Sequence, residues 1–332
     1  MIPAIGPVPD DEARPRWSVM IPAYRADLEL LRRALESVLA QAPGPAQMQI
    51  EVVDDGSGPG DGAEELVAKI GDGRVEWFTQ PANVGAPANF TTCVERARGR
   101  WVHILHADDA VLPGFYDTYG DAIDAHPYVV AVAGQAFVVD AADRYLGVTP
   151  VLPIVDGLIA DAPRVIAMQH PMNFAATVVA RDAYERVGGF DTELVHANDW
   201  EMWSRLATLG PIAGVATPLA FYRRHAASDS TRLQRSGRYL TDTLAALDIV
   251  AARFDDAETQ RQVRRAGRAL VRGYAFGVAS GHLAEGRSRL ALVDAVRGLR
   301  VAPSIPAAVT ATDLAVRAVA ARARRLRRPA RS

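Results

Sequence analysis

The residues most suited to chemistry are the histidine and two adjacent aspartates of HADD at 106–109, directly after the apolar run WVHIL at 101–105. Two carboxylates held together at the end of a buried strand repel each other. This repulsion raises the pKa of one of them and costs stability unless a cation neutralises the pair. Carboxylate oxygens are preferred ligands of divalent metals. The cluster therefore indicates a divalent-cation site at the end of a strand.

Two more polar clusters accompany apolar runs in the same way: PAYR at 22–25 overlaps the end of WSVMIPA, and DDGS at 54–57 follows QIEVV. Asp-Gly-Ser after a strand is also a common turn, so DDGS by itself is weak evidence of function. Ligands of open α/β sheets bind beyond the carboxyl ends of the strands. We therefore expect the three clusters to face one crevice.

The elements that would position these clusters alternate along the first part of the chain. Apolar runs of strand length are separated by segments whose apolar residues recur at helical spacing, which is typical of βα units and a mostly parallel sheet. We expect strands at 17–23, 49–53, 75–78, 101–105 and 128–132, and helices at 28–39, 63–70, 88–97 and 114–125.

Beyond residue 140 the connections are Pro-rich, and from residue 231 the chain is rich in Ala, Leu and Arg and has helical periodicity. We expect a strand at 174–180, a helix at 199–209, a strand at 214–222 and then a helical C-terminal region. Residues 1–16 have acidic residues and prolines where a secretory signal needs basic residues and an apolar run, so we expect a disordered leader.

Composition excludes several classes of protein. Cys93 is the only cysteine, which excludes an internal disulfide or a cysteine metal cluster and fits a cytoplasmic location. No apolar run reaches the roughly 18 residues of a membrane helix. The net charge of −2 combines an acidic body with a basic end, because residues 314–332 hold seven Arg and no Asp, Glu or Lys. We expect no nucleic-acid partner, and either a solvated tail or a peripheral contact with the inner face of an anionic membrane. The C-terminal helices are also candidates for a homodimer contact.

The succession IPAYR, VVDDGS, NVGAPANF, ARGRWVHILHADD, GGFD, NDWEMWSRL and YRRH resembles family 2 of the inverting glycosyltransferases in the order and spacing of its motifs. The resemblance covers residues 17–230 and implies the GT-A fold, a mostly parallel, Rossmann-like sheet flanked by helices. It implies a nucleotide-sugar-binding half at 17–139, an acceptor-binding half at 140–230 and a helical region with a basic tail at 231–332. The implied activity is metal-dependent transfer of a sugar from a nucleoside-diphosphate sugar to an acceptor hydroxyl, with inversion.

The family's donor-binding roles carry over to the strand ends and the loops beside them. Asp54 would accept a hydrogen bond from the imide N–H of a uracil-like base, which favours a UDP-sugar, whereas Asp55 would organise the turn. Many relatives carry Arg where Ala88 stands, so one contact to the nucleotide is missing. Side chains of neighbouring residues on a strand face opposite sides, so at most one of Arg223 and Arg224 would point inward. The implied donor-binding residues are Pro22, Ala23, Tyr24, Asp54, Asn83, Gly85, Asn89, Ala107, Asp108, Arg223 and Arg224.

HADD corresponds to the family's metal-binding Asp-x-Asp motif, in which Asp108 would hold a divalent cation, Mn²⁺ or Mg²⁺, bridging both phosphates. His106 stands where the family usually has the first Asp. It would be a metal ligand, contact the ribose or a metal-bound water, or simply pack. Asp109 would orient Asp108 or cap the next helix. His225, in YRRH, matches a segment that sometimes supplies a metal or phosphate contact, and a surface-loop position is equally consistent with the sequence.

Asp199, in NDWEMW, matches the family's general base, which takes a proton from the acceptor hydroxyl. Helix geometry separates Asp199 from Glu201 by about 200° around the axis, so only one of them faces the site. We expect Glu201 to pair with Arg205 on the surface. Trp203 and Leu206 fall on a helical stripe and are expected in the core or under the acceptor.

Two rival interpretations are tested against the same motifs. A sugar nucleotidyltransferase would carry a Gly-rich, basic loop after the first strand, which PAYRADLE lacks. A non-catalytic nucleotide-sugar-binding protein would keep the nucleotide clusters and lose the base, yet both Asp108 and Asp199 are present. The acceptor stays open between a glycan, a lipid-linked glycan and a small molecule.

Overall fold

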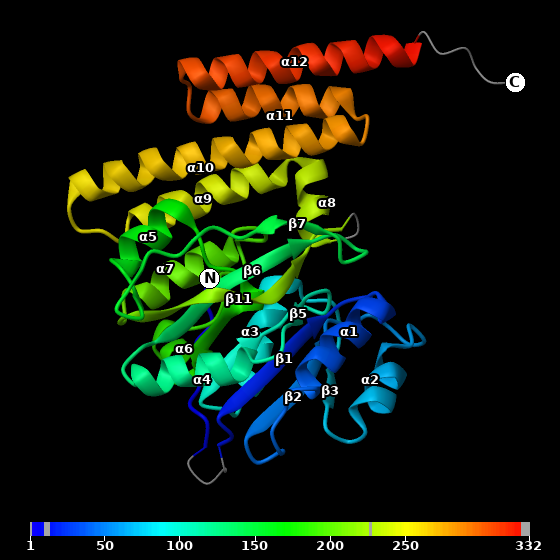
Figure 1. Ribbon diagram of the computed structural model, residues 1–332, viewed down its shortest axis with the longest axis vertical. Coiled ribbons are helices and arrows are strands. Elements are labelled where there is room, and N and C mark those ends of the chain that lie inside the picture. Colours follow the sequence, from blue (N-terminus) through cyan, green and yellow to red (C-terminus); the bar gives the residue numbers. More distant parts are fainter. Residues whose placement is uncertain (1, 10–13, 226–227, 327–332) are drawn as a thin grey trace, which may run out of the picture. The chain divides into compact units, whose positions relative to one another are not determined.

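The computed structural model describes residues 2–9, 14–225 and 228–326, and it divides into two compact units (Figure 1). The first unit contains the described residues up to 166 together with 170–225, and the second contains 167–169 and the described residues from 228 onward. The first unit is α/β and the second is helical. This agrees with the expected fold class.

The first unit is built on one sheet, whose described strands run in the order β3-β2-β1-β4-β10-β6-β11-β9-β8, with β5 paired to β11 and β7 paired to β6. β1 pairs in parallel with β2 and β4, and β6 pairs in parallel with β11, whereas β10 runs antiparallel between β4 and β6. The strands are β1 (Trp17–Ala23), β2 (Met48–Asp54), β3 (Glu76–Thr79), β4 (Trp101–Ile104), β5 (Ala110–Val111), β6 (Ala131–Val139), β7 (Tyr145–Val148), β8 (Ile154–Val155), β9 (Leu158–Ile159), β10 (Thr177–Ala180) and β11 (Ile212–Arg223).

The central strands and their helices form for simple reasons. Every residue of β1 and β2 is buried, as expected for parallel strands covered on both faces. The first helix starts where the side chain of Asp27 accepts hydrogen bonds from the amides of Glu29 and Leu30, and it buries one apolar face. The helices of this unit are α1 (Leu28–Leu39), α2 (Ala63–Gly71), α3 (Ala86–Arg96), α4 (Phe115–Ala125), α5 (Ala162–Gln169, whose last turn belongs to the second unit), α6 (Arg181–Val187) and α7 (Asn198–Ala207).

Two expected strands have different bounds in the structure. The strand expected at 128–132 begins three residues later and continues to Val139 as β6. The strand expected at 174–180 begins as a short 3₁₀ helix, η1 (Phe174–Ala176), because the side chain of Asn173 accepts a hydrogen bond from the amide of Ala176. Only the last four residues of that segment join the sheet as β10.

The expectation of a disordered leader is wrong for the described residues before Trp17. Ile5 is buried, the carbonyl of Pro3 accepts a hydrogen bond from the amide of Gly189, and the carbonyl of Gly6 accepts one from Arg181. These backbone contacts hold the segment against the first unit. Residues 10–13 lie outside the described part of the chain.

The second unit is helical, as expected. Tyr239 and Leu240 pack with Val271, Ala275 and Val278 in one apolar cluster. None of the helices in the described part of the chain combines the length and apolarity that a bilayer crossing requires. The helices are α8 (Asp229–Ser236), α9 (Arg238–Ala251), α10 (Ala257–Ala284), α11 (Ser288–Val301) and α12 (Ile305–Leu326).

Candidate active site

The three polar clusters lie at one edge of the sheet. PAYR ends β1, DDGS begins at the end of β2, and HADD follows β4. Because β1 lies between β2 and β4 and is parallel to both, the carboxyl ends of all three strands meet at the same edge. The amide of Asp55 donates to the carbonyl of Ala23 (2.8 Å), which joins the first two clusters directly. Pro22 is buried within β1, and the ring of Tyr24, just beyond it, is exposed.

Asp55 organises the loop beside the donor cluster, as expected. Its carboxylate accepts hydrogen bonds from the amide of Val84 (2.7 Å), the amide of Gly85 (3.0 Å) and the side chain of Asn83 (3.0 Å). Burial raises the pKa of Asp55 although the amides of Val84 and Gly85 act in the opposite direction. A Cβ on Gly56 would lie 2.7 Å from the backbone of Ala82, so this glycine lets the two loops meet.

Asp54 and Asn89 are held by protein groups. Asp54 is buried, and its carboxylate accepts hydrogen bonds from the amide and the hydroxyl of Ser57. Asn89 is also buried, and its side chain donates to the carbonyl of Val53 (2.9 Å). This hydrogen bond ties α3 to β2, and the donor-binding role expected for Asn89 stays a prediction. Asp54 still lies at the end of β2, where a base would be read.

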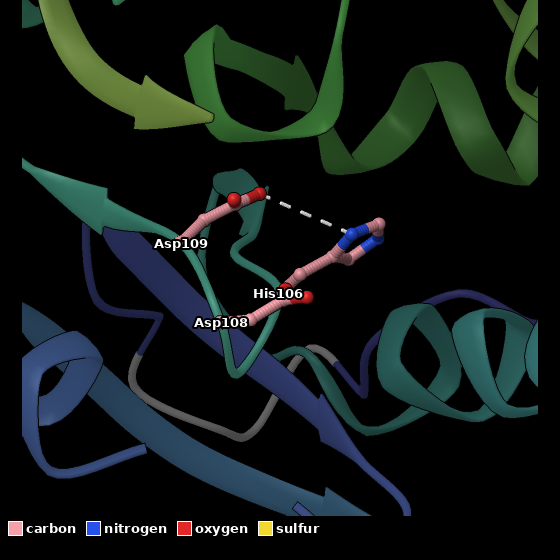
Figure 2. Close-up of side chains that lie close together, drawn as sticks. All are labelled: His106, Asp108 and Asp109. Carbon is pink, nitrogen blue, oxygen red and sulfur yellow. Dashed lines mark ion pairs between the residues drawn. The ribbon is translucent and has the colours of Figure 1, made fainter. Parts of the chain in front are cut away.

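His106, Asp108 and Asp109 form the cluster expected for a cation (Figure 2). Each side chain offers one ligand atom, and these atoms lie within 4.8 Å of one another. The imidazole of His106 and the carboxylate of Asp109 point toward each other, with Nδ1 4.0 Å from Oδ2. Ligands on opposite sides of a small divalent cation are about 4 Å apart, so only a small movement separates this arrangement from a coordination site. Ala107 lies in the turn between His106 and Asp108.

Two buried polar atoms in this cluster have no hydrogen-bond partner in the described residues: Nε2 of His106 and Oδ2 of Asp109. Burial lowers the pKa of His106, which favours the neutral imidazole that a metal requires. Burial and the charge of Asp108 raise the pKa of Asp109 well above its usual value. A cation between Nδ1 of His106 and Oδ2 of Asp109 would satisfy the orphaned carboxylate oxygen and remove the repulsion between the carboxylates. The residues present therefore fit a divalent metal.

His225 completes the cluster from the end of β11. Its Nε2 lies 2.8 Å from Oδ2 of Asp108, although 117 residues separate them in the chain. Burial by itself would raise the pKa of Asp108, but the hydrogen bond from His225 and the charges of His225 and His106 lower it. The same hydrogen bond raises the pKa of His225. The structure thus places His225 at the cluster and not in a surface loop.

Of the two arginines after this strand, only Arg223 points inward, as expected: it is buried and Arg224 is exposed. The guanidinium of Arg223 donates to the carbonyls of Asp108 and Asp140 (2.8 Å each) and forms an ion pair with Asp143. Its amide donates to Oδ1 of Asp109 (2.8 Å). These contacts brace the loop that carries the aspartates, and the expected role of Arg223 as a diphosphate clamp stays a prediction.

Asp199 lies in the first turn of α7, and Oδ2 is 3.2 Å from Nε2 of His170. Oδ1 accepts a hydrogen bond from the amide of Trp200 (2.8 Å). Burial raises the pKa of Asp199, but the charge and hydrogen bond of His170 outweigh burial and lower it overall. The carboxylate is therefore poised as an ionised proton acceptor. No sequence pattern singles out His170, a lone histidine before a proline.

Glu201 does not lie on the surface, and that expectation is wrong. The side chain is fully buried and makes a bidentate ion pair with Arg205, which in turn donates to the carbonyls of Val187 and Gly189. The pairing with Arg205 is confirmed, but α7 is buried on both faces. Trp203 and Leu206 are in the core, as expected.

The sequence matches the family model described as Glycosyl transferase family 2 over residues 18–170. A relative from Mycobacterium tuberculosis, the uncharacterized protein MT1568, is 26% identical over 252 residues, which are 69% of this chain and 74% of that protein. The succinoglycan biosynthesis protein ExoO of Rhizobium meliloti is 36% identical over 111 residues, which are 33% of this chain and 29% of that protein.

Solved structures share the fold. S. aureus TarS 1-349 in complex with UDP-GlcNAc superposes with a TM-score of 0.61 at 14% identity, over 95% of this chain and 93% of that chain. The mannosyltransferase PcManGT of Pyrobaculum calidifontis, in complex with GDP-Man and Mn²⁺, superposes with a TM-score of 0.52 at 18% identity, over 97% of this chain and 90% of that chain. The chain is a glycosyltransferase with the GT-A fold. The match to glycosyltransferase family 2 lies in residues 18–170, slightly less than half of the chain.

Proposed function

We propose that this glycosyltransferase is metal-dependent and inverting, and that it moves a sugar from a UDP-sugar to an acceptor hydroxyl. One observation carries the proposal. The ring of His106, in the cation cluster, packs on Phe174 with centroids 4.7 Å apart, and Phe174 packs on Trp203 (5.2 Å) of α7, the helix whose first turn carries Asp199. The candidate cation site and the candidate base therefore lie on neighbouring elements of the first unit, as single displacement at one carbon requires.

The cation would be held by Asp108, with His106, His225 and Asp109 beside it. When bound there, a divalent cation neutralises the charge that develops on the leaving diphosphate. Arg223 keeps the loop of Asp108 and Asp109 in place through its backbone contacts.

Asp199 performs the other half of the reaction. Its carboxylate takes the proton of the acceptor hydroxyl while the acceptor oxygen bonds to the anomeric carbon. The bond from that carbon to the diphosphate oxygen breaks, and its electron pair leaves with the nucleoside diphosphate. Attack from the face opposite the leaving group inverts the configuration.

The preference for uridine is supported by Asp54 at the end of β2, where a carboxylate can accept the imide N–H, and by the UDP-GlcNAc complex of the structurally similar TarS. A panel of UDP-, GDP- and dTDP-sugars, each with Mn²⁺ or with chelator, tests the function without knowledge of the acceptor. Calorimetry and slow release of the diphosphate are measured. Binding of a UDP-sugar that needs the cation is expected, and full binding and turnover in excess chelator would contradict the proposal.

We also propose that the C-terminal helix contacts an anionic membrane surface. Ile305, Val309, Val316 and Val319 form an exposed stripe on α12, and the sequence adds seven Arg after Asp313 with no acidic residue. An apolar face beside a basic segment is complementary to anionic lipid. A glycan or lipid-linked acceptor would be met at such a surface.

Removing the residues after Asp313, and separately changing Val309 and Val316 to Ser, should each lower binding to vesicles that contain phosphatidylserine without lowering UDP-sugar hydrolysis. Unchanged vesicle binding at low salt would refute the membrane contact. Conversion of a dimer to a monomer by the same changes would instead assign the stripe to the homodimer expected from the sequence.

A further inference from the structure

The side chain of His170 contacts the candidate base, Asp199. His170 is the residue after α5, and its Nε2 lies 3.2 Å from Oδ2 of Asp199. An ionised carboxylate can only accept a hydrogen bond, so the proton of this hydrogen bond is on Nε2 of His170. Both side chains are mostly buried, with exposed fractions of 27% and 20%. A hydrogen bond shielded to this degree is stronger than one on an open surface.

The backbone and the ring of His170 are both constrained. The residue ends α5 in the left-handed conformation, with φ of 44°, a region that costs energy for residues with a side chain but is less unfavourable for His and Asn. Its ring stacks on the indole of Trp200, with centroids 5.5 Å apart and planes inclined by 20°. The indole is itself fixed, because it is fully buried and donates to the carbonyl of Ile166 (2.8 Å).

Trp200 also holds the other oxygen of the carboxylate. Its amide donates to Oδ1 of Asp199 at 2.8 Å, while His170 occupies Oδ2. Two donors in fixed positions set the plane of the carboxylate, and each oxygen keeps further lone pairs for a substrate. Trp200 therefore contacts both the ring of His170 and the carboxylate of Asp199.

We propose that His170 is the positioning residue for the base: its Nε2–H holds Asp199 in the orientation from which the free lone pairs meet the acceptor hydroxyl. This inference rests on the proposed function of Asp199. His170 keeps its proton throughout, so the reaction it serves is the proton transfer to Asp199 already described. Precise placement of a reacting group accounts for large factors in rate.

The charged and titratable groups facing Asp199 come from three segments. They are His170 at the end of α5, His196 in the loop before α7, and His106 after β4. Of these three imidazoles, only that of His170 lies within hydrogen-bond distance of the carboxylate in the described part of the chain. Loss of the His170 imidazole should therefore change the pH dependence of the reaction, whereas a packing defect would not.

Three substitutions separate the roles of the ring, the donor and the backbone. His170→Phe keeps a ring to stack on Trp200 and removes the donor. His170→Asn tolerates the left-handed backbone and removes the ring. His170→Gln replaces the donor with an amide N–H. The full chain is used with Mn²⁺, and the probe reaction is hydrolysis of the fastest UDP-sugar of the panel, in which water takes the place of the acceptor.

His170→Phe and His170→Asn should lower kcat by about 10- to 100-fold, the range typical of residues that orient a reacting group, with UDP affinity within about twofold. The acidic limb of the pH profile should move to higher pH, because the carboxyl loses the partner that lowers its pKa while its burial remains. His170→Gln should recover part of kcat and of the pH profile.

A His170→Phe variant with the kcat and pH profile of the wild type would overturn the inference. So would a loss of activity in all three variants that is matched by loss of UDP affinity and thermal stability, since that pattern describes packing alone. The Asp199→Asn variant distinguishes failure of the proposed base from failure of the positioning role of His170. If it remains active, the proposed function of the base fails. If it is inactive while His170→Phe is fully active, only the positioning role fails.

Discussion

Two pairs of adjacent aspartates follow parallel strands in this protein, and the structure treats them in opposite ways. Asp54 and Asp55, after β2, accept hydrogen bonds from amides, a hydroxyl and an asparagine side chain of nearby loops. Asp108 and Asp109, after β4, face two imidazoles, and Oδ2 of Asp109 has no hydrogen-bond partner among the described residues.

The difference lies in what remains for a ligand. The carboxylate of Asp55 accepts hydrogen bonds from loop donors on both oxygens, so it stabilises the loop and has little left to offer a metal ion, whereas Asp54 can still accept from a base. A carboxylate that shares a buried space with a second carboxylate and the neutral imidazole of His106 is stabilised by a positive charge nearby. Asp54 and Asp55 therefore belong to the loop on the donor side, whereas Asp108 and Asp109 are suited to bind a cation.

The largest effect should follow from Asp108→Asn, which removes a charge from the ion-binding pair. We expect metal-dependent UDP-sugar binding to be abolished and turnover to fall by more than about 100-fold, because removal of a group that stabilises the developing charge costs that much. Calorimetry with UDP and Mn²⁺ measures the binding. Normal metal-dependent binding of the UDP-sugar by the Asp108→Asn variant would contradict the difference between the two aspartate pairs.

Asp199→Asn should lower hydrolysis of the UDP-sugar by about two orders of magnitude or more while UDP binding barely changes, because the amide cannot take a proton. The matched control is Glu201→Gln on the same helix. Glu201 is buried against Arg205, so this control should lower the unfolding free energy by about 3 kcal/mol, the cost of breaking a buried pair. Activity per folded molecule should stay normal. Equal catalytic loss in both variants would show that α7 matters only for stability.

Asp55→Asn tests the structural pair. The substitution retains shape and one acceptor oxygen but weakens the bonds from Val84, Gly85 and Asn83. We expect the unfolding free energy to fall by about 2 kcal/mol, typical for hydrogen bonds to a charged group, with Mn²⁺ affinity nearly unchanged. Denaturant unfolding measures the first quantity and calorimetry the second. A loss of Mn²⁺ affinity as large as that of Asp108→Asn would contradict the division of roles.

The smallest effect should be a pH dependence of stability in chelator. The folded-state pKa of His225 is raised by Asp108, so its contribution to stability is full below the ordinary pKa of histidine and is lost as pH rises through the raised value. The lowered pKa of Asp108 means that the same pair also loses its contribution when pH falls through that lower value. The melting temperature measured across this range should show a high-pH decline that His225→Asn removes. A decline that persists in the variant would assign it to another group.

Local patterns were sufficient for most of the first unit. The buried runs of β1 and β2 and the helical spacing of α1 to α4 are short-range features, so their positions could be predicted to within a few residues. The exceptions have causes that periodicity does not reveal. The side chain of Asn173 starts a 3₁₀ turn where a strand is expected, and the carbonyls of Pro3 and Gly6 find donors far along the chain.

The amino-acid sequence by itself indicated the resemblance to the family, the strands at whose ends the acidic clusters stand, and the candidate pair Asp108 and Asp199. Only the tertiary structure decided which groups surround them: His225 on Asp108, His170 on Asp199 and Arg205 on a buried Glu201. Side-chain type and strand ends are properties of neighbouring residues and can be read along the chain. Desolvation and long-range hydrogen bonds depend on which segments pack together, and that is fixed only when the whole unit is folded.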